Sequence, residues 1–333
     1  MASAYIPNAQ RYDGVMQYRR CGLSGVMLPI LSLGFWHNFG HNTTEAQSRS
    51  ILRAAFDSGI THFDLANNYG PEPGAAEVFM GRVLHDDFLH HRDELFIATK
   101  AAYDMWEGPY GSWASRKHLM ASLDQSLQRM RLDYVDLFYC HRYDPGTPLQ
   151  ETLQALVDIV RAGKALYVGL SRWPSEAAQT GYAYLRQHDV PCLICQGRLN
   201  LFDQAARQQM TEAAAAGAGF ISFSPLAQGL LTDRYLHGIP QDSRMARDPR
   251  FLRPDALTPA VQLRIAALND IAARRGEALA TMALAWILHH KEVTSVIVGA
   301  SSPEQLRRNL ACLTSAPFSE EELDEIEKVT NQQ

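Results

Sequence analysis

Four residues of this chain could together transfer a proton. Asp64 lies at the end of a short apolar segment, and Tyr69 follows it in a loop rich in glycine and proline. Lys100 and His141 each follow a further apolar segment directly. Each residue alone also has a structural explanation, such as a helix cap, a salt bridge or a hydrogen-bonded core position. A carboxylate, a phenol, an ammonium and an imidazole at the ends of successive segments are much harder to explain by packing.

These side chains suit chemistry at a carbonyl oxygen. A phenol has an ordinary pKa of about 10 and is a poor acid at neutral pH. We expect the ammonium of Lys100 to lower the pKa of Tyr69, and the carboxylate of Asp64 to keep Lys100 charged and oriented. Tyr69 could then give a proton to an oxygen that becomes an alkoxide, while a neutral His141 donates a hydrogen bond. The set is typical of carbonyl reduction, in which hydride and proton arrive from different sides.

The segments that position these residues alternate between predicted strands and predicted helices. Eight short apolar runs predict strands, and a segment with helical periodicity follows each of them. Asn42 is predicted to cap the first helix, with Glu45 as the reciprocal acid of a capping box. The predicted strands are Ile30–Phe35, His62–Leu65, Leu95–Thr99, Tyr134–Cys140, Ala165–Leu170, Leu193–Cys195, Gly219–Phe223 and Val293–Val298.

Strict alternation of strand and helix fits either an open, doubly wound sheet or a closed barrel. Eight units favour the barrel, and so do the unusual residues at the strand ends, because a barrel gathers those ends at one rim. The sequence also lacks the Gly-x-Gly-x-x-Gly motif that a dinucleotide-binding open sheet ordinarily has. We therefore expect the α/β class: a (β/α)8 TIM barrel with an N-terminal β-hairpin and extra C-terminal helices. Residues 1–333 would form a single domain, with its core at about 17–313.

Composition and charge argue against several other classes of protein. The net charge is −5 and no basic block is present, so a nucleic-acid partner has no electrostatic support. No run approaches the length of a membrane span, and Met1–Arg20 lacks the apolar core of a signal peptide, so we expect no membrane association. The 5 scattered cysteines favour free thiols and a cytoplasmic location. The strand ends offer one histidine and one aspartate, too few for a metal-dependent hydrolase, so no metal site is predicted.

Several segments resemble the aldo-keto reductase family, and the resemblance runs from about Tyr18 to Leu313. The sequence is similar in particular to the branch of this family that holds bacterial L-glyceraldehyde 3-phosphate reductases and β-subunits of voltage-gated potassium channels. The segments that carry the resemblance are Phe63–Gly70, Thr99–Lys100, Leu137–His141, Phe223–Gly229 and, for the branch, Gly299–Asn309.

The resemblance implies reduction of small aldehydes to alcohols with NADPH/NADP+ as the cofactor. Tyr69 would be the proton donor, Lys100 and Asp64 its activators, and His141 the group that orients the carbonyl. The residues implied to bind the cofactor are Trp36, Asp64, Ser171, Arg172, Gln196, Phe223, Ser224, Pro225, Leu226, Gln228, Gly229, Arg234, Arg244, Gly299, Ser301, Gln305 and Asn309. Among these, Ser301 precedes a predicted helix, and helix N-termini attract phosphate through their free N–H groups.

The implied substrate pocket is mostly aromatic, which suits a small carbonyl compound such as L-glyceraldehyde 3-phosphate or methylglyoxal. It would be lined by Trp36, Tyr69, Tyr103, Trp106, His141 and Arg142. Arg142 could bind a substrate phosphate bidentately, which we keep as a hypothesis. The alternative function is a nicotinamide-binding regulatory subunit of a partner protein. His141, which the channel β-subunits lack, favours the reductase. By analogy with the branch, the chain would form a homo-oligomer, a tetramer or larger.

Overall fold

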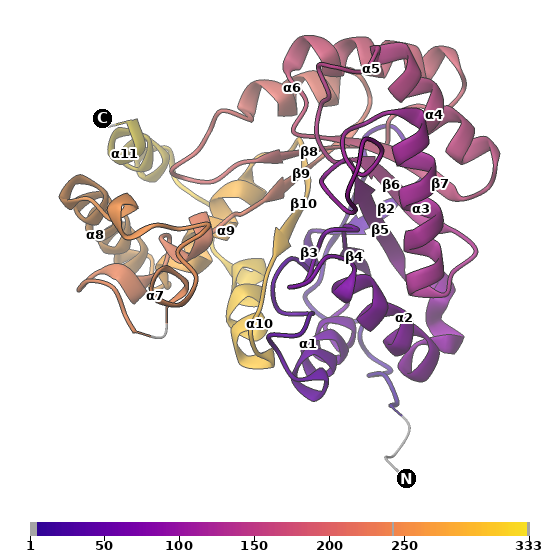
Figure 1. Ribbon diagram of the computed structural model, residues 1–333. Helices are drawn as coiled ribbons and strands as arrows, with labels where there is room; N and C mark the ends of the chain where they lie inside the picture. Colours follow the sequence, from indigo (N-terminus) through magenta and orange to yellow (C-terminus); the bar gives the residue numbers. More distant parts are fainter. Residues whose placement is uncertain (1–4, 242, 332–333) are drawn as a thin grey trace.

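Eight parallel strands close into a barrel in the computed structural model, which describes residues 5–241 and 243–331 (Figure 1). Neighbours around the barrel follow chain order from β3 to β10, and β10 pairs with β3 to close the ring. This confirms the predicted (β/α)8 barrel. The strands are β3 (Leu31–Gly34), β4 (His62–Asp64), β5 (Phe96–Ala101), β6 (Val135–Cys140), β7 (Ala165–Ser171), β8 (Ile194–Arg198), β9 (Gly219–Phe223) and β10 (Val293–Val298).

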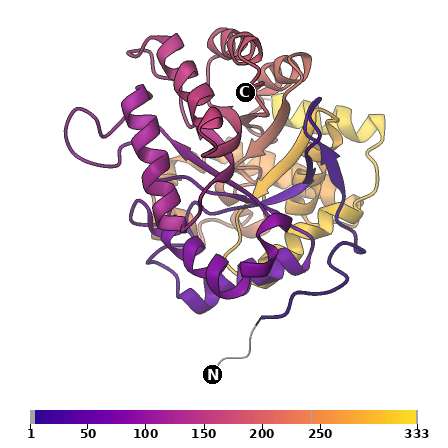
Figure 2. The same ribbon diagram turned by 90° about the vertical axis from the view of Figure 1, so that its right-hand side faces the viewer.

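Helices surround the strands, as the two views in Figures 1 and 2 show. The extra helices α8 and α11 pack against each other beside the barrel, which confirms the predicted C-terminal additions. Short 3-10 turns occupy Leu89–Glu94, Ala227–Gly229, Asp233–Tyr235, Pro254–Ala256 and Ala311–Thr314. The helices are α1 (Glu45–Asp57), α2 (Ala75–Asp87), α3 (Arg116–Met130), α4 (Leu149–Arg161), α5 (Ser175–Gln187), α6 (Arg207–Ala215), α7 (Arg244–Arg247), α8 (Pro259–Arg274), α9 (Leu279–His289), α10 (Pro303–Leu310) and α11 (Glu320–Asn331).

Helix α4 illustrates how the helices hold to the barrel. Leu153, Leu156 and Ile159 recur at helical spacing and are fully buried, while polar residues take the outer face. Each such side chain stabilises the fold by roughly 1.5–3 kcal/mol through the apolar surface it removes from water. Among the described residues, no helix has both the length and the apolar character to cross a membrane.

The first helix begins at a different residue from the one predicted. Thr44 is the N-cap of α1, and its side chain accepts a hydrogen bond from the backbone N–H of Gln47 at 3.3 Å. Asn42 lies in the preceding loop, and Glu45 is the first helical residue, where its carboxylate pairs with Arg49 at 2.7 Å. The predicted capping box is therefore wrong, because a second good capping residue lies two positions further along.

The predicted N-terminal hairpin is confirmed and closes one mouth of the barrel. Strands β1 (Tyr18–Arg20) and β2 (Met27–Pro29) pair antiparallel. Cys21 and Leu28 are fully buried and belong to the cluster that fills the barrel interior. The backbone N–H of Leu23 donates to the carbonyl of Gly217 at 2.9 Å and joins the hairpin to the loop before β9. The mouth that remains is the one formed by the C-terminal strand ends.

Strand register brings the predicted chemical residues to that open rim. Asp64 lies opposite Ala98 on β5, two residues before Lys100, and Ala101 lies opposite Cys140, the residue before His141. On the other side of the barrel, Ser171 pairs with Gln196. The C-terminal ends of neighbouring parallel strands therefore lie at one level, as a barrel requires.

Candidate active site

Lys100 is the centre of the cluster at the rim. Its ammonium donates to Asp64 Oδ2 at 2.6 Å, to the carbonyl of Leu65 at 2.7 Å and to Tyr69 Oη at 3.4 Å. These three contacts match the three N–H donors of an ammonium group. The Lys100 side chain is fully buried, and Asp64 is nearly so. The carboxylate thus compensates a charge that would otherwise be very costly to bury.

Tyr69 brings its hydroxyl between two of the predicted partners. Tyr69 Oη lies 3.5 Å from His141 Nε2 and 3.4 Å from Lys100 Nζ. The Tyr69 and His141 rings meet edge to face, with 5.6 Å between their centres. His141 is buried, and Tyr69 is half-buried in the loop between β4 and α2. The structure therefore brings together all four residues that the sequence singled out.

The pKa of Tyr69 moves in the direction opposite to the one expected. Burial raises the pKa of Tyr69 well above its ordinary value, and the charge of Asp64 raises this pKa further. The expected lowering by Lys100 fails because Asp64, at 2.6 Å, compensates the ammonium charge and the phenolate would lose its hydration. Burial also lowers the pKa of Lys100. At neutral pH the Tyr69 phenol therefore keeps its proton.

His141 is neutral at physiological pH, as predicted. Burial lowers the pKa of His141 well below its ordinary value, and the positive charges of Lys100, Arg172 and Arg142 lower it further. A neutral imidazole carries one ring proton, so it donates a hydrogen bond through one nitrogen only. With the proton on Nε2, His141 and Tyr69 would offer two donors to the same point above the rim.

Residues predicted to hold the nicotinamide lie together at the ends of β7, β8 and β9. Ser171 is 1% exposed, and its Oγ has no hydrogen-bond partner among the described residues. Gln196 donates to the second oxygen of Asp64, Oδ1, at 3.0 Å, so both carboxylate oxygens are occupied. The guanidinium of Arg172 lies 5.9 Å from the centre of the Phe223 ring. A buried hydroxyl that has no partner is a group that a bound polar ligand could satisfy.

The backbone is strained at these strand ends. Arg172 directly follows β7 with φ 57°, and Ser224 directly follows β9 with φ 51°. Neither is glycine, and left-handed backbone at other residues costs of order 1 kcal/mol or more. The side chain of Asn200 donates to the Ser224 carbonyl at 2.9 Å and helps to hold this conformation. Such strain is often concentrated at functional sites.

The remaining predicted cofactor residues lie on two segments. Ser301 donates through its N–H and Oγ to Gln305 Oε1 at 2.7 and 2.8 Å, and Asn309 donates to the Gly299 carbonyl at 3.4 Å. The side chain of Arg244 lies outside the part of the chain that the structure describes. The other segment begins at β9 and holds Phe223, Ser224, Pro225, Leu226, Gln228, Gly229 and Arg234.

The predicted substrate residues separate into three groups. Tyr103 packs edge to face on His141 with 4.7 Å between ring centres, so it lies at the rim cluster. Trp106 instead packs on His118 of α3 at 4.9 Å and lines a cavity of about 530 Å³ in the loop between β5 and α3. Trp36 packs on Phe251, which belongs to the segment between β9 and α8, with 4.7 Å between ring centres.

Sequence reasoning missed Trp113, whose ring lies 3.8 Å from the guanidinium of Arg142. The residue lies in a Gly-Ser-Trp stretch of the loop between β5 and α3, with no hydrophobic period to explain it. A tryptophan in a loop rich in glycine and serine is the signal that could have found it. Within the described residues, no cluster of three or more His, Cys, Asp or Glu side chains could hold a metal ion.

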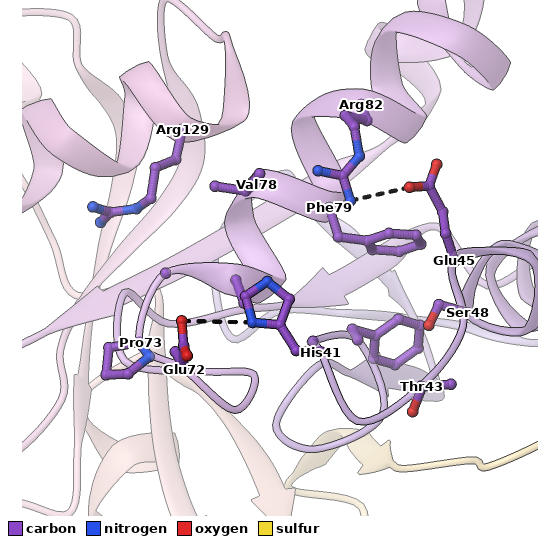
Figure 3. A pocket seen from close by; sticks show the side chains of 14 residues that line it. His41, Thr43, Glu45, Ser48, Glu72, Pro73, Val78, Phe79, Arg82 and Arg129 are labelled. Atoms are coloured by element: carbon purple, nitrogen blue, oxygen red, sulfur yellow. Dashed lines mark ion pairs between the residues drawn. The ribbon is translucent and has the colours of Figure 1, made fainter.

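A separate cavity of about 420 Å³ lies between the loop after β3, the loop after Tyr69 and helix α2 (Figure 3). Among its side chains, His41 lies 3.5 Å from Glu72 and Arg82 pairs with Glu45 at 3.1 Å, as Figure 3 shows, while Arg129 pairs with Glu77 of α2 at 2.7 Å. None of the four rim residues lines it. Sequence reasoning did not point to this cavity, because its residues come from ordinary loop and helix surfaces.

The model of the Aldo/keto reductase family matches residues 30–331. L-glyceraldehyde 3-phosphate reductase of Escherichia coli (strain K12) is 53% identical over 329 residues, which cover 97% of this chain and 95% of that protein. A probable voltage-gated potassium channel subunit beta of Oryza sativa subsp. japonica is 34% identical over 320 residues, covering 94% of this chain and 96% of that protein. The resemblance in the sequence is thereby confirmed, and the chain belongs to the aldo/keto reductase family.

Proposed function

We propose that this protein reduces small aldehydes to alcohols with NADPH, and that Tyr69 donates the proton. One observation carries the proposal: Tyr69 Oη lies 3.4 Å from the ammonium of Lys100 and 3.5 Å from His141 Nε2. A carbonyl oxygen that sits beside these groups can accept hydrogen bonds from both Tyr69 and His141. The cofactor, when bound, supplies the hydride that reaches the carbonyl carbon.

The residues act in sequence as charge moves onto the oxygen. His141 is neutral and orients the carbonyl through its Nε2–H. As negative charge grows on the oxygen, the Tyr69 proton transfers to it, and the resulting phenolate lies within reach of Lys100. Asp64 keeps that ammonium charged and fixed, and Gln196 fixes Asp64. Because the Tyr69 phenol stays protonated until charge develops, its interactions favour the transition state over the ground state.

The proposed nicotinamide site is built from Ser171, Arg172, Gln196 and Phe223. The unpaired Oγ of Ser171 is a hydrogen-bonding group that a carboxamide could satisfy, and Phe223 offers a ring for stacking. We propose that Ser301, Gln305 and Asn309, on and before α10, hold the adenosine end. Arg307 and Arg308 follow on the same helix and supply positive charge that supports NADPH rather than NADH.

L-glyceraldehyde 3-phosphate is the first substrate that we propose, since the relative with that name shares 53% of its residues over almost the whole chain. Methylglyoxal and similar short aldehydes are the next candidates. The regulatory-subunit alternative draws on the 34% identity to the channel subunit. The contact between Tyr69 and His141 favours the reductase, because a mere nucleotide binder has no need of a proton donor beside an orienting imidazole.

We further propose that residues 1–333 form one domain, that copies of the chain assemble into a tetramer or larger homo-oligomer, and that the protein acts in the cytoplasm. The five cysteines are all free and buried, which suits a reducing compartment. Light scattering during size-exclusion chromatography would test the assembly, and a monomeric mass would refute it.

The deciding experiment follows NADPH oxidation with a panel of short aldehydes for wild type, Tyr69→Phe and the control Tyr184→Phe. Tyr69→Phe should lose about 10²- to 10⁴-fold in kcat, the usual contribution of a general acid, while NADPH still binds. Tyr184→Phe makes the same change on α5, outside the rim cluster, and should retain turnover. Near-normal activity of Tyr69→Phe would refute the proposed donor. A wild type that binds NADPH and reduces no aldehyde would favour the regulatory subunit.

A further inference from the structure

Arg142 directly follows His141, and its guanidinium lies between two aromatic rings. The guanidinium carbon is 4.5 Å from the centre of the Tyr103 ring and 3.8 Å from the centre of the Trp113 ring. Nε donates to the carbonyl of Ala102 at 3.1 Å, and Nη2 donates to Ser112 Oγ at 3.0 Å. A planar guanidinium is suited to stack on rings and to donate in its own plane at the same time. All four contacted residues belong to residues 102–113, which we call the rim loop.

The rim loop is closed at its base by a strained backbone. The N–H of Trp113 donates to the carbonyl of Ala102 at 3.0 Å, so that carbonyl accepts from both Trp113 and Arg142. Ala102 has φ 136° and Trp113 has φ 69°, and neither is glycine. Such conformations cost free energy and persist only where surrounding contacts hold them. Arg142 contacts both ends of the loop, so it is the side chain best placed to hold them.

The rim loop in turn determines how His141 is oriented. Tyr103 packs edge to face on His141, with 4.7 Å between centres and 86° between planes. The other ring nitrogen of His141, Nδ1, is buried and has no hydrogen-bond partner among the described residues. No hydrogen bond through Nδ1 therefore fixes the ring, so its orientation depends on packing against Tyr103 and on the contacts with Tyr69, whose Oη lies 3.5 Å from Nε2. The contacts run from Arg142 through Tyr103 to His141.

The same geometry argues against bidentate binding of a substrate phosphate through the Nε–Nη2 edge of Arg142. A guanidinium commonly grips phosphate bidentately with two parallel N–H groups. In this structure the edge formed by Nε and Nη2 already donates to Ala102 and Ser112, and Asp104 Oδ1 lies 3.6 Å from Nη2. A phosphate on this edge would have to displace these contacts and release the loop that shapes the site.

We propose that Arg142 is a positioning residue, which holds the rim loop in its strained conformation and, through Tyr103, orients His141 for the reaction. The inference rests on the aldehyde reductase activity proposed above. It requires that loss of Arg142 affects phosphorylated and unphosphorylated aldehydes alike. It also requires that the loop opens when Arg142 is removed, whatever the protein's activity.

The test compares wild type with Arg142→Met and Arg142→Lys, using L-glyceraldehyde 3-phosphate and L-glyceraldehyde as paired substrates. Arg142→Met keeps the apolar stem, and Arg142→Lys keeps the charge but lacks the planar fork and guards against misfolding of the first variant. Both variants should lose about 10²-fold in kcat, the scale of a displaced catalytic group, with the two aldehydes affected within about threefold of each other. Arg274→Met, which removes an arginine whose side chain is 58% exposed on α8, serves as the control.

A second readout follows chymotrypsin cleavage at the aromatic residues of the rim loop. Cleavage at Trp106, Tyr110 or Trp113 should be at least about tenfold faster in Arg142→Met than in wild type or Arg274→Met, because an opened loop is more accessible. Loss confined to the phosphorylated aldehyde, with unchanged cleavage, would overturn the proposal and restore the phosphate ligand. If wild type reduces neither aldehyde, the proposed function fails, and the cleavage rates alone decide whether Arg142 holds the loop.

Discussion

The ion pair between Lys100 and Asp64 should be measurable in the free energy of unfolding. Lys100→Met removes the ammonium but keeps an unbranched chain of similar length. Asp64 is 2% exposed, and its Oδ2 would lose the partner at 2.6 Å, leaving only the Gln196 contact on Oδ1. A buried charge left without its partner costs about 3–5 kcal/mol, so we expect a loss of about 4 kcal/mol. Urea unfolding at neutral pH without nucleotide, extrapolated linearly to water, would measure this loss.

Two further variants test whether Asp64 depends on the charge of Lys100. Lys100→Met combined with Asp64→Asn removes both charges and should cost at most about 2 kcal/mol, the usual penalty of a buried polar group without its partner. Lys164→Met breaks the pair with Asp124, also at 2.6 Å, but those side chains are 33% and 46% exposed, so it should cost less than about 1 kcal/mol. A double variant as unstable as Lys100→Met, or a loss below about 1 kcal/mol for Lys100→Met itself, would show that Asp64 does not depend on Lys100.

Three other measurements follow from the structure. Burial lowers the pKa of His62 to about 4, whereas an unfolded histidine has a pKa of about 6.5. Between pH 6.5 and pH 4, His62 binds a proton in the unfolded chain but not in the folded chain. The free energy of unfolding should therefore fall by about 3 kcal/mol over this range on account of His62. His62→Gln should flatten that part of the stability curve, and an unchanged slope would contradict the assignment. Ser171→Ala should leave the stability of the cofactor-free protein within about 0.5 kcal/mol and weaken NADPH binding about tenfold, since one hydrogen bond to the cofactor is lost; equal affinities in a fluorescence titration would remove Ser171 from the site. In the hairpin, a Cβ on Gly22 would lie 2.1 Å from the Gly217 carbonyl oxygen, whereas one on Gly25 meets nothing within 4 Å. Gly22→Ala should therefore lower the melting temperature, by about 2–4 °C for each kcal/mol lost, and Gly25→Ala should not, so equal melting temperatures would disprove the close approach.

The order of strands and the rim cluster could be predicted because they depend on local patterns. Each buried parallel strand corresponds to a short apolar run in the sequence. The end of the strand can be recognised because a polar residue follows the run. Lys100, His141 and Ser171 follow or end such runs, so the barrel topology alone brings them to one rim. The predicted strands therefore carry most of the information about where the reaction would occur.

The features that were missed depend on contacts between segments. Thr44 and Asn42 are both good caps, and the sequence does not tell which of them the loop geometry brings to the helix. The raised pKa of Tyr69 depends on how completely water is excluded from the phenol, which only the folded packing determines. Arg142 and Trp113 meet because non-glycine residues of the rim loop take left-handed backbone conformations, which no pattern in the sequence announces.

The hairpin that closes one mouth of the barrel also bears on how ligands would bind to the rim and leave it. Cys21 and Leu28 belong to the cluster that fills that end, so with the proposed function the cofactor and the aldehyde would both enter at the rim formed by the C-terminal strand ends. Whichever of them binds deeper at the rim would then bind first and leave last. The order of release would therefore be the reverse of the order of binding. A product that stays bound at the rim would therefore block exchange of a molecule bound beneath it.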